Sequence, residues 1–303
     1  MTATATLLAL LASGATAAFQ EPMIAPQAAA MGGASMAVPN DSTAMFLNVA
    51  GMSALAAPEI YLMASKLYAG QDSGASLSKN FMTAGLPTKL GSFGLAVGEF
   101  KAAGLMAERT FALGFARAIG RYARVGVSGK LLQHGFSPQG DALAESDPVF
   151  RNGTSKSAFG LDLGLMTSPL PMLDVGLAVR NVNRPNVGLA SEDRVPREFR
   201  GGMALRFSGI GVTATGELAM RSGPATGPWS AMVPSVGLEK TLMNGLVAFR
   251  VGGGPTELTG GVGLRRGNFG FDYSIAWSRT LSAGTFGSHL IGIRYQFAPR
   301  GSR

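Results

Sequence analysis

Side chains that could perform catalysis are few in this sequence. Its 303 residues include 2 histidines, His134 and His289, and no cysteine. Acyl transfer by a Ser–His pair needs a third group that orients the histidine, and neither histidine has a carboxylate at an informative spacing. The glycine runs at 252–254 and 260–261 precede no helical pattern, so they do not resemble phosphate-binding loops. We therefore expect no enzymatic activity, no cofactor and no metal site.

Charged side chains offer another kind of chemistry, because many occur singly within runs of alternating apolar residues. We expect thirteen of them to face a common interior: Arg124, Lys130, Asp162, Asp174, Arg180, Arg200, Arg206, Glu217, Glu239, Arg250, Arg265, Asp272 and Arg294. They could form ion pairs or guide an anion. Interleaved acids favour ion pairs. The basic residues are spread along the chain rather than clustered, which argues against nucleic-acid binding.

The elements that must position these charges are strands. The clearest is 269–278, whose apolar face holds Phe269, Phe271, Tyr273, Ile275 and Trp277. Successive side chains of a strand point to opposite sides, so Asp272 must face away from the aromatic residues. Similar alternation recurs at 159–166, 173–180, 199–207, 247–252 and 291–297, with no helical pattern between these segments.

Composition and loop lengths indicate that these strands cross a membrane. Hydrophobic residues make up 46% of the chain and charged residues 15%, yet beyond the N-terminus no apolar run is long enough for a membrane helix. About fourteen alternating segments can be counted, and their connections alternate between short turns and mostly longer loops. The sequence therefore predicts an all-β fold, a 14-stranded antiparallel transmembrane β-barrel. A soluble β-sandwich is the alternative, but it gives no reason for alternating loop lengths.

The chain divides into four parts. Residues 1–18 have a short apolar core followed by Thr16, Ala17 and Ala18, which predicts a signal peptide cleaved before Phe19. No basic residue precedes the core, so we expect its start to be truncated; an ordinary N-terminal helix is the alternative. Residues 19–58 precede the barrel, which we expect to span 59–297, and 298–303 form a tail. Tyr295 and Phe297 end the last strand, as in terminal strands read by barrel-assembly machinery; they equally fit an aromatic girdle.

Residues 19–58 do not alternate and are rich in Ala, Met and Gly. A barrel of this strand number has a lumen that its wall side chains cannot fill. We therefore expect this segment to fold inward as an N-terminal luminal hatch; a disordered tail is the alternative. The residues that mark it are Met31, Gly32, Gly33, Ala34, Asn48, Ala50 and Gly51.

The stretches 31–38, 41–44 and 48–51 resemble the N-terminal signature of the PorV/PorQ and FadL group of outer-membrane proteins. The resemblance implies a fourteen-stranded barrel with an N-terminal hatch in the bacterial outer membrane. Some members carry long-chain fatty acids or other hydrophobic molecules, whereas others serve the type IX secretion system.

Three functions follow as expectations. The first is passage of a hydrophobic or amphipathic small molecule, with the apolar part bound by the hatch and an acidic head by luminal Arg residues. The second is a PorV/PorQ-like accessory role in protein secretion, and the third is a passive or structural barrel. The expected partners are outer-membrane lipid and lipopolysaccharide, the barrel-assembly machinery, and either a hydrophobic ligand or secretion-system proteins.

Overall fold

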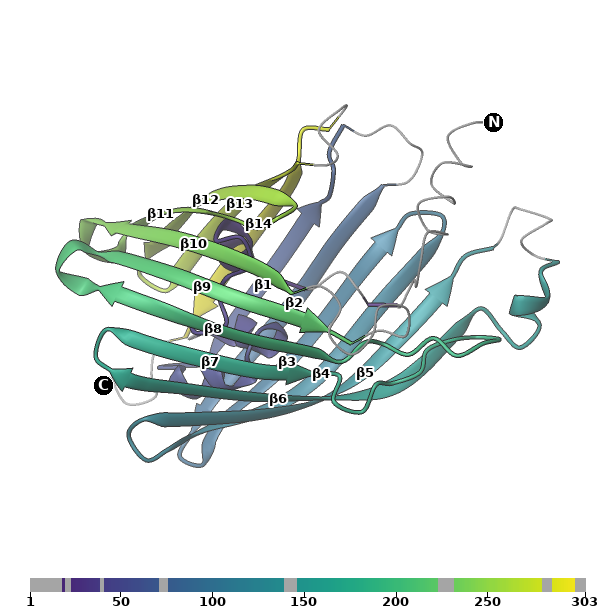
Figure 1. Cartoon of the computed structure of the whole chain (residues 1–303), viewed down its shortest axis with the longest axis horizontal. Coiled ribbons are helices and arrows are strands. Elements are labelled where there is room, and N and C mark those ends of the chain that lie inside the picture. The colour runs from purple at the N-terminus through teal and green to yellow at the C-terminus, as the bar shows by residue number, and fades with distance from the viewer. Residues whose placement is uncertain are drawn as a thin grey trace.

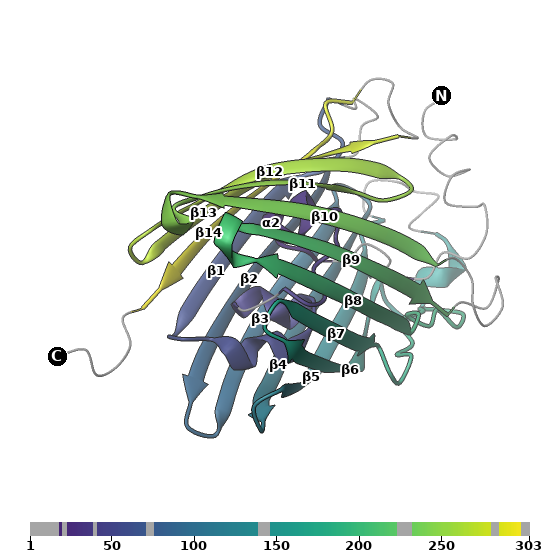
Figure 2. The same cartoon turned by 60° about the vertical axis from the view of Figure 1, so that its left-hand side comes forward.

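The computed structural model describes residues 18–19, 23–38, 41–70, 76–138, 146–222, 232–279 and 285–297. Within these residues, fourteen strands form one closed antiparallel barrel, in which β1 pairs with β14 (Figures 1 and 2). The predicted number and direction of strands are thus confirmed. The strands are β1 (Glu59–Lys66), β2 (Leu77–Thr88), β3 (Gly91–Ala102), β4 (Met106–Ile119), β5 (Ala123–Phe136), β6 (Ser155–Leu170), β7 (Leu173–Arg180), β8 (Glu198–Phe207), β9 (Val212–Arg221), β10 (Val233–Leu242), β11 (Val247–Gly253), β12 (Glu257–Arg266), β13 (Phe269–Ser278) and β14 (Ser288–Gln296).

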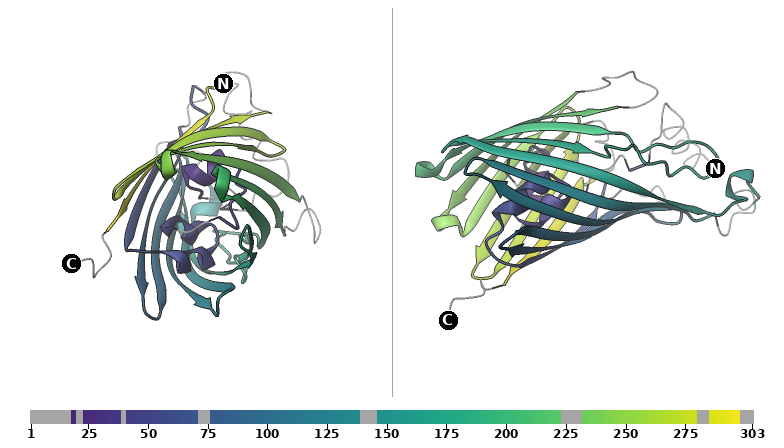
Figure 3. Two further views of the ribbon diagram at one scale, coloured as in Figure 1. Left: turned by 90° about the vertical axis from the view of Figure 1, so that its left-hand side faces the viewer. Right: turned by 90° about the horizontal axis from the view of Figure 1, so that it is seen from below.

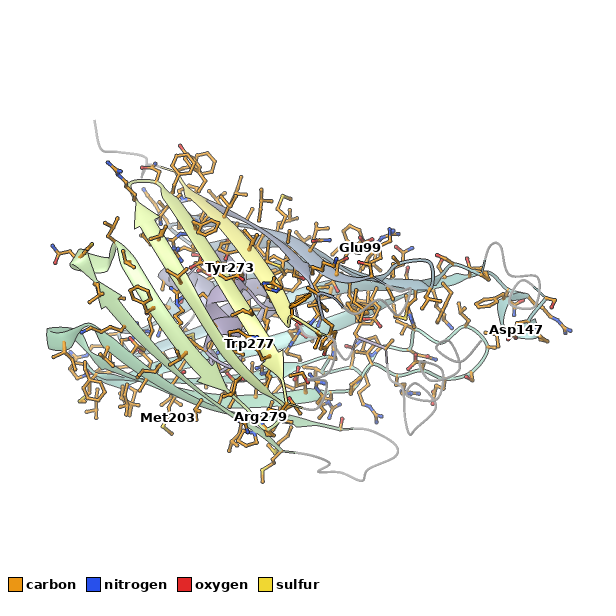
Figure 4. The ribbon with its side chains drawn as sticks, turned by 90° about the horizontal axis from the view of Figure 1, so that it is seen from above. Glu99, Asp147, Met203, Tyr273, Trp277 and Arg279 are labelled. Carbon is orange, nitrogen blue, oxygen red and sulfur yellow. The ribbon has the colours of Figure 1, made fainter. Side chains whose placement is uncertain are left out.

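The two faces of the wall differ as the alternation requires. On β13, Asp272 and Ser274 are fully buried inside, whereas Phe271 and Trp277 are exposed outside. Large apolar side chains cover the outer surface of the other strands as well, and Met203 and Trp277 mark it in Figure 4. An apolar outer face and a polar inner face are typical of a barrel that stands in lipid.

The two rims are unequal. At one rim the six turns contain two to four residues each, and several use glycine with positive φ, such as Gly120 and Gly267. At the other rim the connections range from three residues, at 103–105 and 254–256, to eighteen, at 137–154. The longest one carries the short helix η3 (Pro148–Phe150) and extends beyond the strands, where Asp147 lies in Figure 4. We call these the short-turn rim and the loop rim.

The short-turn rim also holds the end of the last strand. Tyr295 faces outward, with its ring centroid 4.9 Å from that of Phe269 and 4.8 Å from that of Phe297. The backbone N–H of Phe297 donates to the Pro58 carbonyl at 2.8 Å. The predicted tail (298–303) and the predicted signal peptide, apart from Ala18, lie outside the described residues.

Three short helices precede the barrel: α2 (Pro26–Ala30), η1 (Ser42–Phe46) and η2 (Val49–Ala54). They lie inside it, and Figure 3 shows them in purple, enclosed by the strands. Two further single turns, η4 (Ser208–Ile210) and η5 (Met243–Gly245), lie at the short-turn rim. Among the described residues, each helix is too short or too polar to cross a membrane.

The lipid-facing role of the outer surface can be tested with two leucines of equal exposure. Leu113, at mid-height of β4, and Leu90, in a turn of the short-turn rim, are each 67% exposed. We expect Leu113→Arg to lower the free energy of unfolding by about 2–4 kcal/mol, because it places a charge in hydrocarbon. Leu90→Arg should have little effect. The measurement is denaturant unfolding in phospholipid vesicles, and equal effects of the two substitutions would contradict a membrane-spanning wall.

Candidate functional site

The candidate site is the barrel lumen with the chain that occupies it, residues 23–38 and 41–57, which we call the luminal segment. Its first helix, α2, packs against β11, β12 and β13. Its later helices, η1 and η2, pack against the opposite part of the wall, from β1 to β6. The segment therefore crosses the lumen and contacts most of the circumference of the barrel (Figure 3).

Glycines on the inner face of the wall provide the space for this segment. A Cβ atom on Gly126 would lie 2.5 Å from the Ala50 backbone nitrogen, and one on Gly237 would lie 2.6 Å from the Met31 Cβ. Real Cβ atoms do not approach other atoms this closely, so a larger residue would displace the segment. The other inward glycines that the segment touches are Gly85, Gly94, Gly98, Gly114, Gly164, Gly176, Gly202, Gly252 and Gly261.

Two wall carboxylates hold the backbone of the segment. The Glu217 carboxylate accepts the N–H groups of Ser35 and Met36, both at 2.9 Å. The Glu59 carboxylate accepts the Ser42 N–H at 2.9 Å and the Ser42 hydroxyl at 3.0 Å. Buried backbone donors must find acceptors, and an ionised oxygen is a strong one. These two glutamates therefore replace the hydrogen bonds that a regular element would supply.

Amide and hydroxyl side chains complete the anchoring. Asn48, fully buried at the start of η2, donates from Nδ2 to the Met36 and Leu165 carbonyls, both at 3.1 Å. Its Oδ1 accepts the Ala50 N–H at 3.3 Å and so caps the helix. On β12, the Thr259 hydroxyl accepts the Gly32 N–H at 2.9 Å. The same hydroxyl donates to the Ala30 carbonyl at 3.0 Å.

The residues predicted to mark the hatch all lie in this part of the structure. Met31, Gly32, Gly33 and Ala34 follow α2, and the two glycines turn the chain with φ of +66° and +79°. Asn48, Ala50 and Gly51 form the start of η2 against β5 and β6. The structure brings both groups to the wall but on different strands, so they act as separate anchors rather than as one motif.

All thirteen predicted luminal charges lie on the inner face of the wall, where they pair. Asp272 is fully buried and accepts from Arg250 at 2.9 Å and from Arg265 at 2.7 Å. Arg250 also pairs with Glu239 at 2.6 Å. The remaining pairs are Lys130–Asp162 at 2.8 Å, Arg200–Glu217 at 2.6 Å, Arg206–Asp174 at 2.6 Å, Arg124–Asp174 at 3.5 Å, Arg180–Glu198 at 3.1 Å and Arg294–Glu59 at 3.6 Å.

Several luminal carboxylates were absent from the sequence prediction, and Glu59, Glu108 and Glu198 are the most buried of those on the strands. Glu59 and Glu198 are the first residues of β1 and β8, where alternation has only begun, so the pattern is weakest there. Glu108 lies on β4, two residues after the strand begins. For Glu59 and Glu198 the available signal is local, since each is followed by an apolar residue, Ile60 or Phe199, on the opposite face. Glu108 is followed by Arg109, so no such signal marks it.

The apolar part of the site lies between the segment and β1–β4. Met45, Met52 and Phe46 of the segment pack with Tyr61 and Phe81 of the wall. The ring centroids of Phe46 and Phe81 are 5.1 Å apart, which is within the range of favourable aromatic contact. The lumen therefore has an apolar cluster at β1–β4, although Glu59 and Glu108 also lie on these strands, and most ion pairs lie on the strands that follow.

The segment is closely packed. A cavity of about 20 Å³ lies between α2 and η1, lined by Ala28, Met31 and Thr43 among others. Space of this size holds about one water molecule, whereas an apolar cavity that takes benzene measures about 150 Å³. A hydrocarbon cannot enter this part of the lumen unless the segment moves.

The two histidines lie on opposite faces of the wall and do not contact each other. His289 faces outward, and its Nδ1 lies 2.7 Å from the Tyr273 hydroxyl. His134 is buried inside β5, with Phe136 beside its ring at a centroid distance of 4.4 Å. Both lie near the loop rim, but on opposite faces of the wall.

Comparison with solved structures identifies the fold. The CymD monoaromatic hydrocarbon channel aligns with a TM-score of 0.65 at 17% identity, covering 90% of this chain and 97% of CymD. The toluene transporter TbuX of Ralstonia pickettii aligns with a TM-score of 0.62 at 14% identity, covering 92% and 100% of the two chains. A Pseudomonas aeruginosa FadL homologue gives 0.58 at 12% identity, covering 91% and 99%.

These similarities show that the chain has the FadL-type barrel fold. They support the resemblance of the sequence to FadL. The resemblance to PorV and PorQ stays a prediction. A scan against models of known families finds no match, and a search of curated proteins finds no relative by sequence.

The close contact between the inward glycines and the luminal segment can be tested by placing a large side chain at one of these glycines. Gly126→Leu should displace η2 from the wall, because overpacking a tight contact costs about 1–3 kcal/mol. We expect a larger single-channel conductance in planar bilayers. Gly216→Leu is the matched control, because Gly216 faces outward and a Cβ there meets no described atom within 4 Å. Unchanged conductance of Gly126→Leu would show that the segment does not obstruct the lumen.

Proposed function

We propose that this protein lets small hydrophobic molecules pass across the bacterial outer membrane, and that the luminal segment is a movable hatch. The observation that carries the proposal is the occupied lumen, in which an apolar Met–Phe cluster lines one side. The fold is shared with a monoaromatic hydrocarbon channel and with toluene transporters, which supports the same class of cargo here.

The charge arrangement favours a neutral cargo over a fatty acid. Each of the eight predicted luminal cations already contacts a carboxylate, from Lys130 with Asp162 to Arg294 with Glu59. An entering carboxylate would have to compete with these partners, and breaking a buried ion pair is costly. A neutral monoaromatic hydrocarbon makes no such demand and fits the apolar side at β1–β4.

Uptake assays separate these cargo classes. Cells that lack a hydrocarbon transporter of their own should gain toluene uptake when they produce this protein, and should gain little palmitate uptake. Preferential palmitate uptake would show that an acidic head group is accepted. If neither is taken up and components of a secretion translocon co-purify with the barrel, the PorV/PorQ-like alternative is favoured instead.

Hatch movement can be tested with a disulfide, because the chain has no cysteine of its own. A Cβ on Gly85 would lie 3.5 Å from the Ser42 Cβ, within the range for a disulfide. It would also lie 2.5 Å from the Leu55 Cδ1, the end of a flexible side chain that must rotate aside. We expect the double variant Ser42→Cys, Gly85→Cys to lose toluene uptake when oxidised and to regain it when reduced. The same protein in its reduced form is the control. Equal uptake in both forms would show that cargo passes without movement of η1.

A further inference from the structure

A loop, 181–197, between β7 and β8 folds inward at the loop rim. Val187 and Val195 of this loop are fully buried, in a cluster with Leu132 of β5 and with Ala18. The loop is held in shape by two backbone hydrogen bonds, from Val187 to Asp193 at 2.9 Å and from Val195 to Pro185 at 2.8 Å. It therefore presents a defined surface to the lumen.

The chain at residues 18 and 19 lies between this loop and the wall. The Phe19 N–H donates to a Glu108 carboxylate oxygen at 2.7 Å, and the Ala18 N–H donates to the Asp193 carboxylate at 3.2 Å. Glu108 belongs to β4 and is only 5% exposed. Two carboxylates from different parts of the barrel thus converge on two consecutive backbone nitrogens.

The side chain of Phe19 is also placed. It packs against the cluster of Leu132 and the two buried valines, and its ring centroid is 6.4 Å from that of His134. A chain end without a specific position would not show this combination of side-chain packing and charge-assisted hydrogen bonding.

The backbone of Phe19 is strained while Ala18 is attached. Its φ is +60°, in the left-handed region that a bulky residue rarely adopts. This torsion is defined by the bond to Ala18, so it ceases to exist if the peptide bond between the two residues is cut. The small residues Thr16 and Ala18 stand at the positions that signal peptidases require before a cleavage point.

We propose that signal-peptide cleavage between Ala18 and Phe19 creates a new α-ammonium group, and that Glu108 and Asp193 are its binding site. Hydrolysis adds water across the Ala18–Phe19 amide. The carboxylate leaves with the signal peptide, and the nitrogen of Phe19 takes up a proton to become an ammonium. Departure of Ala18 frees the Asp193 carboxylate to accept from the same nitrogen.

The charge balance supports this assignment. A buried ammonium is stable only with anionic partners that accept its hydrogen bonds, and two carboxylates supply them. The resulting contact joins β4 to the loop 181–197 near the loop rim. Cleavage therefore does more than remove the signal peptide, because the new ammonium of Phe19 links Glu108 to Asp193 and so holds the loop 181–197 inward.

The test begins with the mature protein purified from outer membranes. N-terminal sequencing and intact mass should place the first residue at Phe19. Its α-amine should react with an amine-specific acylating reagent at neutral pH at least about tenfold more slowly in the folded barrel than in denaturant, because the paired ammonium is not nucleophilic.

Isosteric variants identify the binding groups. Glu108→Gln and Asp193→Asn should each speed acylation of the Phe19 amine in the folded barrel, and the double variant should approach the rate in denaturant. Glu192→Gln is the matched control, because Glu192 neighbours Asp193 but is exposed and pairs with Arg194. A mature protein that starts elsewhere, or equal acylation rates in the folded and denatured wild type, would overturn the proposal.

Discussion

The constraint on which the rest of the structure depends is the need to satisfy an irregular backbone inside a barrel. The described residues 23–38 and 41–57 contain only three short helices, which leave many of their N–H and C=O groups without a partner inside an element. The wall supplies partners instead, through Glu217, Glu59 and Thr259 and through the Leu165 carbonyl, which accepts from Asn48 of the segment. Its inner face must therefore be polar at these points, and it must be free of side chains where the backbone comes closest.

These two requirements explain why the inner face of the wall carries both charged residues and glycines. Charged residues that are not used by the segment pair with one another, as Arg250 does with Glu239 and Asp272, because an unpaired buried charge is costly. The anchors of the segment are hydrogen bonds that water can replace if the lumen fills. Each such exchange costs little net free energy, whereas losing the same bonds in an apolar core costs about 1–3 kcal/mol apiece. A segment held by such hydrogen bonds can be well ordered and can still be displaced when water replaces those bonds.

The sequence predicts the wall better than its contents. Alternation identifies the strands because lipid on one side and the lumen on the other impose a period of two on each strand. The plainest case is β13, where Asp272 faces the lumen and Trp277 faces outward. Which charges pair is set by strand register and by neighbours far apart in the chain, so Glu59 with Arg294 could not be inferred from spacing. The partners of the segment are more remote still: Ser35 lies 182 residues from Glu217, and no local pattern records their contact.

The distribution of polarity around the lumen bears on the proposed passage of a small molecule beside the luminal segment. Met45, Met52 and Phe46 pack on β1–β4, and the ion pairs are spread mainly over β5–β13. If the segment is withdrawn, the apolar cluster opens along one side while the paired charges keep the other side hydrated. On the proposed function, a neutral molecule would follow the apolar side, because leaving water is favourable there and no ion pair has to break. Apart from Glu59 on β1, the wall groups that anchor the segment, Glu217, Thr259 and the Leu165 carbonyl, lie on other strands, so the wall could bind the segment tightly without binding the cargo tightly.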